Sequence, residues 1–306
     1  MSKLALSTSW NIARHKDAQS LIQEIKLIGF NKLELNFTLT REMVEGVALL
    51  QKKGEIEVVS LHNYCPMPEG LGQKTVFPDH YSLASLDEAE RKEAVRYTKI
   101  SIDTARRLDA KVVVFHAGRV QMPDRTVDLI KLYSAGKKDE PAYNKIKDSF
   151  IKERALKIQP HLEQILRSID ELERYAAKCK VYLGLENRFY YREIPNYEEI
   201  GIILNKFKKS RLFYWHDVGH AQVMQELGFY NHIDFLNKYK DRLIGFHLHD
   251  LVGCRDHLAP SSGRFDFKIL VPFIKRNTLK VIEAHAQASV GEVIRAKEYL
   301  EKILNV

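Results

Sequence analysis

The feature that most constrains the fold is an alternation of short β-branched runs with longer amphipathic stretches, which recurs eight times along the chain. Several short runs are nearly continuous apolar segments, as expected for strands covered on both faces. Eight strand-then-helix units predict a single (β/α)8 TIM barrel, with a doubly wound open sheet as the competing α/β fold. The predicted strands cover residues 4–7, 32–36, 56–62, 111–116, 181–186, 212–217, 243–247 and 279–283, and the predicted helices cover about 17–28, 41–52, 87–108, 142–178, 196–207, 220–240, 265–276 and 289–304.

The length of 306 residues fits one barrel of this kind, which typically takes about 250 residues plus insertions. Because no stretch is typical of an interdomain linker, we expect residues 1–306 to form one domain. The extra residues fall in an insertion at about 117–157, after the fourth strand, which we interpret as a solvated loop over the active face that could act as a lid. The helical pattern at 142–178 is unusually long, so Pro160 is expected to break or start a helix there.

Composition excludes several classes of protein. Hydrophobic residues make up 45% and charged residues 29%, which is ordinary for a globular chain. No apolar run approaches the ~20 residues that cross a bilayer, and no signal peptide precedes the first strand, so we expect a cytoplasmic protein without a membrane partner. The three cysteines, Cys65, Cys179 and Cys254, form no Cys-x-x-Cys pair, which argues against a disulfide framework. The net charge of +8 favours anionic partners, but its lysines are scattered along predicted helices.

Metal-binding side chains end six consecutive predicted strands, from the third to the eighth. Because the C-terminal ends of parallel barrel strands open on one face, these groups are expected to converge on one site. Two further histidines, His220 and His257, lie just beyond the sixth and seventh strands. The six strand-end residues are His62, His116, Glu186, Asp217, His247 and Glu283.

Imidazole and carboxylate donors without thiolate suit a divalent transition metal such as Zn²⁺ or Mn²⁺, and one to three ions fit the set. Glu186 and Glu283 follow apolar runs, so each ionised carboxylate requires a positive neighbour, which a cation would supply. His249 alternates with His247 and is expected to point away from the barrel interior as a structural residue. Asp250 is either a solvated loop carboxylate or a group that orients a ligand imidazole.

Six short motifs at these strand ends together resemble the xylose isomerase-like TIM-barrel superfamily. This superfamily contains sugar and sugar-phosphate isomerases and epimerases, and the endonuclease IV type of apurinic-site endonuclease (AP endonuclease family 2). The resemblance spans nearly the whole chain, and it is more specific for the superfamily than for one activity. The motifs are Ser60-Leu-His62-Asn-Tyr, Phe115-His116-Ala-Gly118, Leu185-Glu186-Asn187, His216-Asp217-Val-Gly-His220-Ala, Phe246-His247-Leu-His-Asp250 and Val281-Ile-Glu283.

The epimerase branch of the superfamily holds one divalent metal at the ends of strands five to eight. Its resemblance to this chain implies Glu186, Asp217, His247 and Glu283 as the ligands. The two glutamates serve in that branch as acid and base around a metal-bound enediolate, and His220 is implied to contact a substrate hydroxyl. The implied reaction is isomerisation or epimerisation of a small sugar or sugar phosphate.

The endonuclease branch binds three zinc ions and hydrolyses phosphodiesters at abasic sites in DNA. Resemblance to it implies His62 and His116 as ligands of an additional first metal, with Glu186 bridging two ions. His220 and His257 match two ligands of a third metal in the same way.

The third metal of that branch also takes an aspartate two positions before the second histidine. That position is Arg255 here, and Asp256 lies one place out of register. The sequence therefore leaves a third metal in doubt and a dinuclear centre credible.

Cationic and aromatic side chains follow the fifth strand in the segment 187–195, where they suit a polyol or a phosphate. Arg188 and Arg255 are the candidate substrate-binding cations. The same segment could also stack on and neutralise a nucleic acid strand. We favour the sugar isomerase or epimerase, with a zinc phosphodiesterase acting on abasic DNA and a non-catalytic metal-binding barrel as alternatives. The sequence leaves a monomer and a homodimer equally open.

Overall fold

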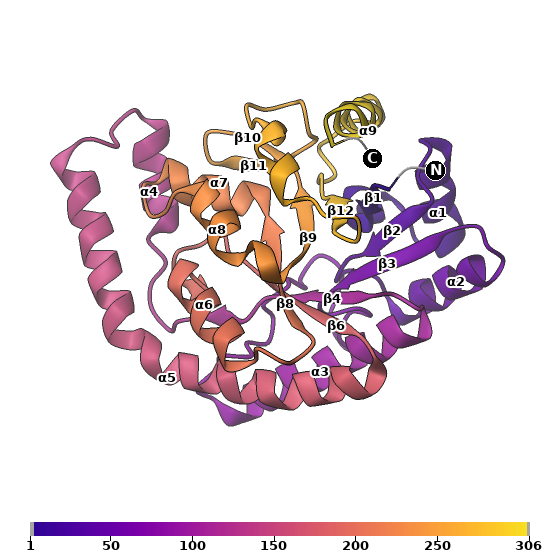
Figure 1. The fold of residues 1–306 in the computed structure, drawn as a ribbon, viewed down its shortest axis with the longest axis horizontal. Coiled ribbons are helices and arrows are strands. Elements are labelled where there is room, and N and C mark those ends of the chain that lie inside the picture. The colour runs from indigo at the N-terminus through magenta and orange to yellow at the C-terminus, as the bar shows by residue number, and fades with distance from the viewer. Residues whose placement is uncertain (1–2, 305–306) are drawn as a thin grey trace.

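The computed structural model describes residues 3–304, and within them eight parallel strands close into a barrel surrounded by helices (Figure 1). The order around the barrel is β1-β12-β9-β8-β6-β4-β3-β2. This arrangement confirms the predicted (β/α)8 barrel and excludes the open sheet. The barrel strands are β1 (Ala5–Ser7), β2 (Lys32–Leu35), β3 (Glu57–His62), β4 (Val112–Phe115), β6 (Tyr182–Glu186), β8 (Leu212–Asp217), β9 (Leu243–Leu248) and β12 (Leu279–Ile282).

The helices flank the barrel on its outer side, and most begin at a side-chain cap. The Asp87 carboxylate, for example, accepts hydrogen bonds from the backbone N–H groups of Ala89 and Glu90 at the start of α3. The region predicted as one helix at 220–240 forms two, and Gly228, with φ of 73°, lies between them. The helices are α1 (Ala18–Leu27), α2 (Arg41–Lys52), α3 (Glu88–Arg107), α6 (Tyr197–Lys206), α7 (Val218–Glu226), α8 (His232–Tyr239) and α9 (Val290–Leu304), with a 3₁₀ helix, η4, at Phe267–Phe273.

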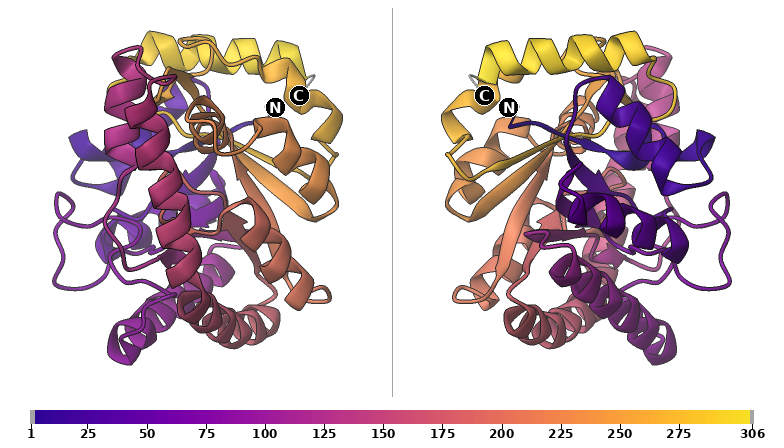
Figure 2. Two further views of the ribbon diagram at one scale, coloured as in Figure 1. Left: turned by 90° about the vertical axis from the view of Figure 1, so that its left-hand side faces the viewer. Right: turned by 90° about the vertical axis from the view of Figure 1, so that its right-hand side faces the viewer.

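The segment after β4 differs from its predicted form as a solvated loop. It contains β5 (Gly118–Arg119), α4 (Thr126–Ser134) and the first part of α5 (Pro141–Cys179). The prediction that Pro160 breaks or starts a helix was wrong, because α5, which is 39 residues long, continues through it. Figure 1 shows α5 curving along the outside of the molecule, and Figure 2 shows its later part beside α3.

Tertiary contacts on both sides of Pro160 explain why α5 continues. Before it, the Tyr143 hydroxyl donates a hydrogen bond to the Leu227 carbonyl. After it, the fully buried side chains of Ile165 and Ile169 pack in the core. These contacts on both halves offset the one backbone hydrogen bond that proline removes.

A small apolar layer fills the barrel interior beneath the strand ends. Ala5, Val59, Val112 and Val281 pack there with the fully buried Trp215. The neighbouring strand β9 leaves room for the indole with Gly245, where a Cβ would lie 2.2 Å from Trp215 Cζ3. This layer closes the barrel from below, so a site at the strand ends opens in one direction only.

No helix among residues 3–304 is long and apolar enough to span a membrane. The two antiparallel pairs outside the barrel are β5 with β7 (Glu193–Ile194) and β10 (Asp250–Val252) with β11 (Arg255–Leu258). Both pairs follow barrel strands at their C-terminal ends, and therefore border the same face of the barrel.

Two buried histidines meet between β8 and α8. His216 Nε2 lies 2.9 Å from His232 Nε2, and His216 Nδ1 lies 2.6 Å from the Tyr214 hydroxyl. Burial lowers the pKa of His232 to about 3. Since two cationic rings at this separation would repel each other in a dry environment, the pair is stable only when it is not doubly protonated.

We expect acid to destabilise the protein partly through His232. Its folded pKa of about 3 lies below the ordinary value of about 6.5, so the unfolded chain takes up a proton that the folded chain excludes. The contribution is fully present above pH 6.5 and is lost below it, at up to about 1.4 kcal/mol per pH unit. Urea unfolding at pH 7 to 4.5 should show a shallower loss for His232→Gln than for the wild type. Equal slopes in the two proteins would contradict this assignment.

Candidate metal centre

Four buried side chains at the ends of successive barrel strands form the first candidate metal group. Glu186 ends β6, Asp217 ends β8, His247 lies in β9, and Glu283 directly follows β12. Their ligand atoms all lie within 4.8 Å of one another. His247 Nδ1 is 2.9 Å from Glu186 Oε1 and 3.1 Å from Glu283 Oε2. The structure therefore brings these four predicted site residues together.

The second group, His62, His116 and Glu186, shares one residue with the first. Glu186 Oε2 lies 2.8 Å from His116 Nε2 and 3.3 Å from His62 Nε2, while its other oxygen faces His247. The buried Oε2 atom makes no hydrogen bond with the described part of the chain. Glu186 therefore faces two groups with two oxygens, as a bridging carboxylate would.

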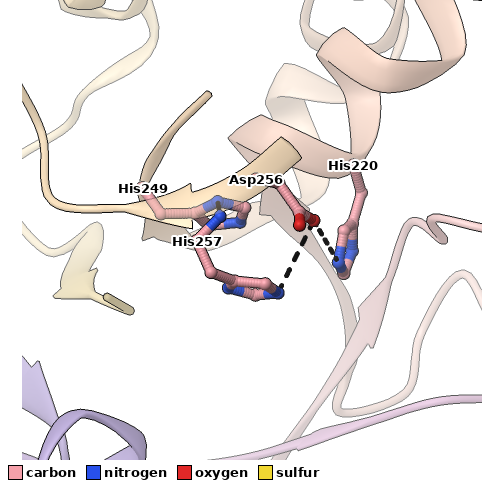
Figure 3. Close-up of side chains that lie close together, drawn as sticks. All are labelled: His220, His249, Asp256 and His257. Atoms are coloured by element: carbon pink, nitrogen blue, oxygen red, sulfur yellow. Dashed lines mark hydrogen bonds and ion pairs between the residues drawn. The ribbon is translucent and has the colours of Figure 1, made fainter. Parts of the chain in front are cut away.

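The third group contains His220, His249, Asp256 and His257 (Figure 3). Asp256 Oδ2 lies 3.6 Å from His257 Nε2 and 3.9 Å from His220 Nε2. Asp256 and His257 are neighbours in β11, and neighbours in a regular strand face opposite sides. His257 has a φ of 53°, which departs from strand geometry and accounts for both side chains facing one place. Asp256, which lies one place out of register in the sequence, therefore still joins the third group in the fold.

The prediction that His249 points away from the interior was wrong. Residues two apart on a strand share a face, so His249 lies on the same side as His247. Its Nε2 is 2.9 Å from both carboxylate oxygens of Asp217, and its Nδ1 accepts a hydrogen bond from the His257 backbone N–H. His249 therefore connects the third group to the first.

Asp250 has a different role from orienting an imidazole. Its carboxylate accepts hydrogen bonds from the backbone N–H groups of Leu251, Gly263 and Phe265. A Cβ at Gly263 would lie 2.4 Å from Asp250 Oδ1, so the loop passes directly over the carboxylate. Asp250 therefore fixes the loop that follows β11.

A pocket of about 250 Å³ opens above these groups. Residues from all three groups line it, together with the aromatic side chains of Phe37, Phe189 and Tyr190. Arg188 also lines it, with ion pairs to Glu193 at 3.2 Å, to Asp79 at 3.3 Å and to Glu186 at 3.6 Å. Its Nε and Nη1 atoms are buried and make no hydrogen bond in the described chain, although Nη1 lies 3.6 Å from Glu186 Oε2.

Arg255, the other predicted substrate-binding cation, is placed differently. It lies in β11 with an exposed side chain, and it is absent from the residues that line the pocket. The position of Arg255 in the sequence does not show which way its side chain points.

The carboxylates of the site have pKa values that diverge. Burial, followed by repulsion from neighbouring carboxylates, raises the pKa of Glu283 to about 8. Burial would also raise the pKa of Glu186, but His247 and His116 outweigh it and hold that pKa well below the usual range. Burial lowers the pKa of His116, yet Asp79 and Glu186 raise it to about 9. The site therefore demands positive charge, which a divalent cation supplies without protonating the histidines.

Sequence reasoning missed Glu34, a carboxylate inside the barrel that contacts His247. It lies within β2 rather than at a strand end, so the search for polar strand ends passed over it. The available signal was a charged residue enclosed by apolar neighbours, Leu33 and Leu35, in a predicted buried strand.

Comparisons with known proteins agree with this architecture. A family model described as a xylose isomerase-like TIM barrel matches residues 22–296. Among curated proteins, Uncharacterized protein y4fM of Sinorhizobium fredii is 25% identical over 114 residues, 37% of this chain. That match covers only 35% of the relative's own length.

Solved structures match over almost the whole chain. A D-tagatose 3-epimerase-like protein superimposes with a TM-score of 0.70 and 19% identity, covering 99% of this chain and 97% of that one. The 3-keto-D-glucoside 4-epimerase YcjR of E. coli gives a TM-score of 0.69 and 14% identity, covering 99% and 100%. TTHB071 of Thermus thermophilus, soaked with zinc chloride, gives 0.60 and 19%, covering 98% of each chain. These likenesses show the fold, and with the family match they establish that the chain belongs to the xylose isomerase-like TIM-barrel family.

Proposed function

We propose that the protein is a divalent-metal-dependent isomerase or epimerase of a small sugar or sugar phosphate. The observation that carries this proposal is that Glu186 and Glu283 belong to one buried four-residue group and also line the pocket above it. The pocket, at about 250 Å³, is of a size for a small ligand. Solved structures of the same fold that are titled sugar epimerases add support.

The donor set fits a transition metal. Three carboxylates and one imidazole, from Glu186, Asp217, Glu283 and His247, would hold Zn²⁺ or Mn²⁺. Glu186 Oε2 lies beside His62 and His116 without a hydrogen bond to either, and burial raises the pKa of Glu283; both features favour a bound cation. When bound, the cation would stabilise the negative charge that develops on the substrate oxygens as a proton leaves the neighbouring carbon.

The protein's own groups would move the proton and hold the sugar. Glu186 and Glu283 come from β6 and from the residue after β12, so they approach the pocket from different sides of the barrel. One carboxylate would remove the proton beside the carbonyl and the other would return one to the adjacent carbon or to the other face. His220, neutral because burial lowers its pKa to about 4, would bind a substrate oxygen. Arg188, whose Nε and Nη1 atoms make no hydrogen bond in the described chain, would bind another.

The alternative activity is hydrolysis of phosphodiesters at abasic DNA sites. The two additional groups favour it, because they provide ligands for up to three ions next to one pocket. The small pocket and the carboxylates that surround Arg188 favour a sugar over a DNA strand. Elemental analysis distinguishes the readings: one metal per chain supports the epimerase, whereas two or three that depend on His62 and His116 support hydrolysis. Metal without turnover on either substrate class would support a non-catalytic barrel.

Metal binding should stabilise the protein through the first group. Zn²⁺ at about 100 times its Kd should add about 2.7 kcal/mol to the free energy of unfolding and raise Tm by roughly 4 °C. Asp217→Asn should lose most of this rise while retaining the cap on α7, since asparagine also caps helices. Asp103→Asn, in α3 and outside the three groups, is the control that should keep the rise. An equal rise in Asp217→Asn and the wild type would contradict the assignment.

Turnover should depend on Glu283. Glu283→Gln should remain folded and lose at least about 100-fold in rate on a panel of ketoses and their phosphates, because proton transfer loses one partner. In D₂O the wild type should incorporate solvent deuterium at the carbon that exchanges its proton. Glu298→Gln, an exposed substitution in α9, should keep full activity. Turnover by Glu283→Gln at the wild-type rate would contradict the proposed function.

A further inference from the structure

Glu34 is a buried carboxylate that none of the roles above uses. It lies in β2 with no exposed surface, where an ionised group is costly unless its neighbours compensate it. Two side chains do so. The Ser60 hydroxyl donates a hydrogen bond to Glu34 Oε2 at 2.8 Å, and His247 Nε2 lies 2.9 Å from Glu34 Oε1. Glu34 therefore connects β2 and β3 to the histidine of the first group, on β9.

The two nitrogens of His247 face different partners. Nδ1 is directed at the other members of the first group, and lies 2.9 Å from Glu186, 3.1 Å from Glu283 and 3.7 Å from Asp217. Nε2 is directed the opposite way, at Glu34. A neutral imidazole carries one N–H, and an ionised carboxylate only accepts. With the N–H on Nε2, the lone pair of Nδ1 points at the place where a cation would be bound.

Packing also fixes the plane of the His247 ring. The Trp215 ring lies edge-on at 5.0 Å between centroids, and the His62 ring stacks at 5.9 Å. These contacts leave the ring tautomer undetermined, because aromatic neighbours do not distinguish the two nitrogens. Both nitrogens lie 2.9 Å from a carboxylate oxygen, of Glu186 for Nδ1 and of Glu34 for Nε2. Direction distinguishes them, because Nδ1 faces the other members of the first group and Nε2 faces Glu34.

We propose that Glu34 is a positioning residue that holds His247 with its proton on Nε2, so that Nδ1 is the metal-ligating atom. This inference rests on the proposed metal-dependent function. Glu34 is absent from the pocket lining, so it would act through His247 rather than on the substrate. A carboxylate that accepts the second N–H of a ligand histidine orients the ring and makes it a stronger donor, and its loss typically costs about 10–100-fold in metal affinity.

Zinc affinity, measured by competition with a chromophoric chelator, tests the inference directly. Glu34→Gln should bind Zn²⁺ about 10–100-fold more weakly than the wild type. The matched control is Glu24→Gln, because the Glu24 carboxylate also pairs with a histidine, His15, at 2.6 Å but lies on α1, outside the site. That control should leave zinc affinity unchanged. Unaltered affinity in a folded Glu34→Gln would overturn the inference.

The same titration separates failure of the inference from failure of the proposed function. A wild type that binds no zinc refutes the metal-dependent function itself, whereas a wild type that binds zinc as tightly as Glu34→Gln refutes only the role of Glu34. Loss of stability alone, seen as a lower Tm with unchanged zinc affinity, would show that Glu34 is merely structural.

Two further measurements cover the case in which Glu34→Gln does not fold. Ser60→Ala keeps the carboxylate but removes the hydrogen bond that fixes it, so zinc affinity should fall in the same direction by a smaller factor. Wild-type affinity in Ser60→Ala would count against the inference. In the zinc-loaded protein, ¹⁵N NMR of labelled histidines should show His247 protonated on Nε2 and not on Nδ1. A proton on Nδ1 would overturn it.

Discussion

Burial of several carboxylates at one end of the barrel is the constraint on which the site depends. Glu34 and Asp217 have no exposed surface, and Glu186 is 1% exposed. Ionised carboxylates in such a place are stable only beside positive charge or several hydrogen-bond donors. The histidines around them meet this need in part by taking up protons, which is why the pKa of His116 rises to about 9. A divalent cation meets the same need while leaving the imidazoles neutral and free to coordinate.

The barrel places these charged groups at the strand ends, above an apolar layer that fills its interior. Each barrel strand from β3 onwards delivers polar groups at its C-terminal end, while its earlier residues pack inside the barrel or against the helices. Trp215 lies directly under His247, and Gly245 leaves space for the indole. Because water is excluded from below, electrostatic interactions at the strand ends are stronger than they would be at an open surface.

Strand positions could be predicted from the sequence because parallel barrel strands are nearly continuous apolar runs that end in a polar residue. The continuity of α5 through Pro160 could not, since it depends on contacts such as that of Tyr143 with Leu227, which no local pattern shows. Glu34 was missed because it lies inside β2, whereas the predicted site residues were taken from the ends of strands. In α5, tertiary packing overrides local preference.

The grouping of the strand-end residues could be predicted from the sequence, because strand periodicity determines the face to which a side chain points. His249 was misplaced although residues two apart share a strand face, so correct use of the period would have found it. Asp256 could not be placed, because the φ of 53° at His257 that turns both side chains to one side is a property of the folded loop. Arg255 is a predicted substrate-binding cation, but its side chain lies exposed and outside the residues that line the pocket.

Anomalous diffraction at the zinc absorption edge, from crystals equilibrated with stoichiometric Zn²⁺, tests the central claim most directly. The account predicts a strong peak enclosed by Glu186, Asp217, His247 and Glu283, within bonding distance of His247 Nδ1. Anomalous peaks confined to histidines outside the pocket, with none among these four residues, would contradict it.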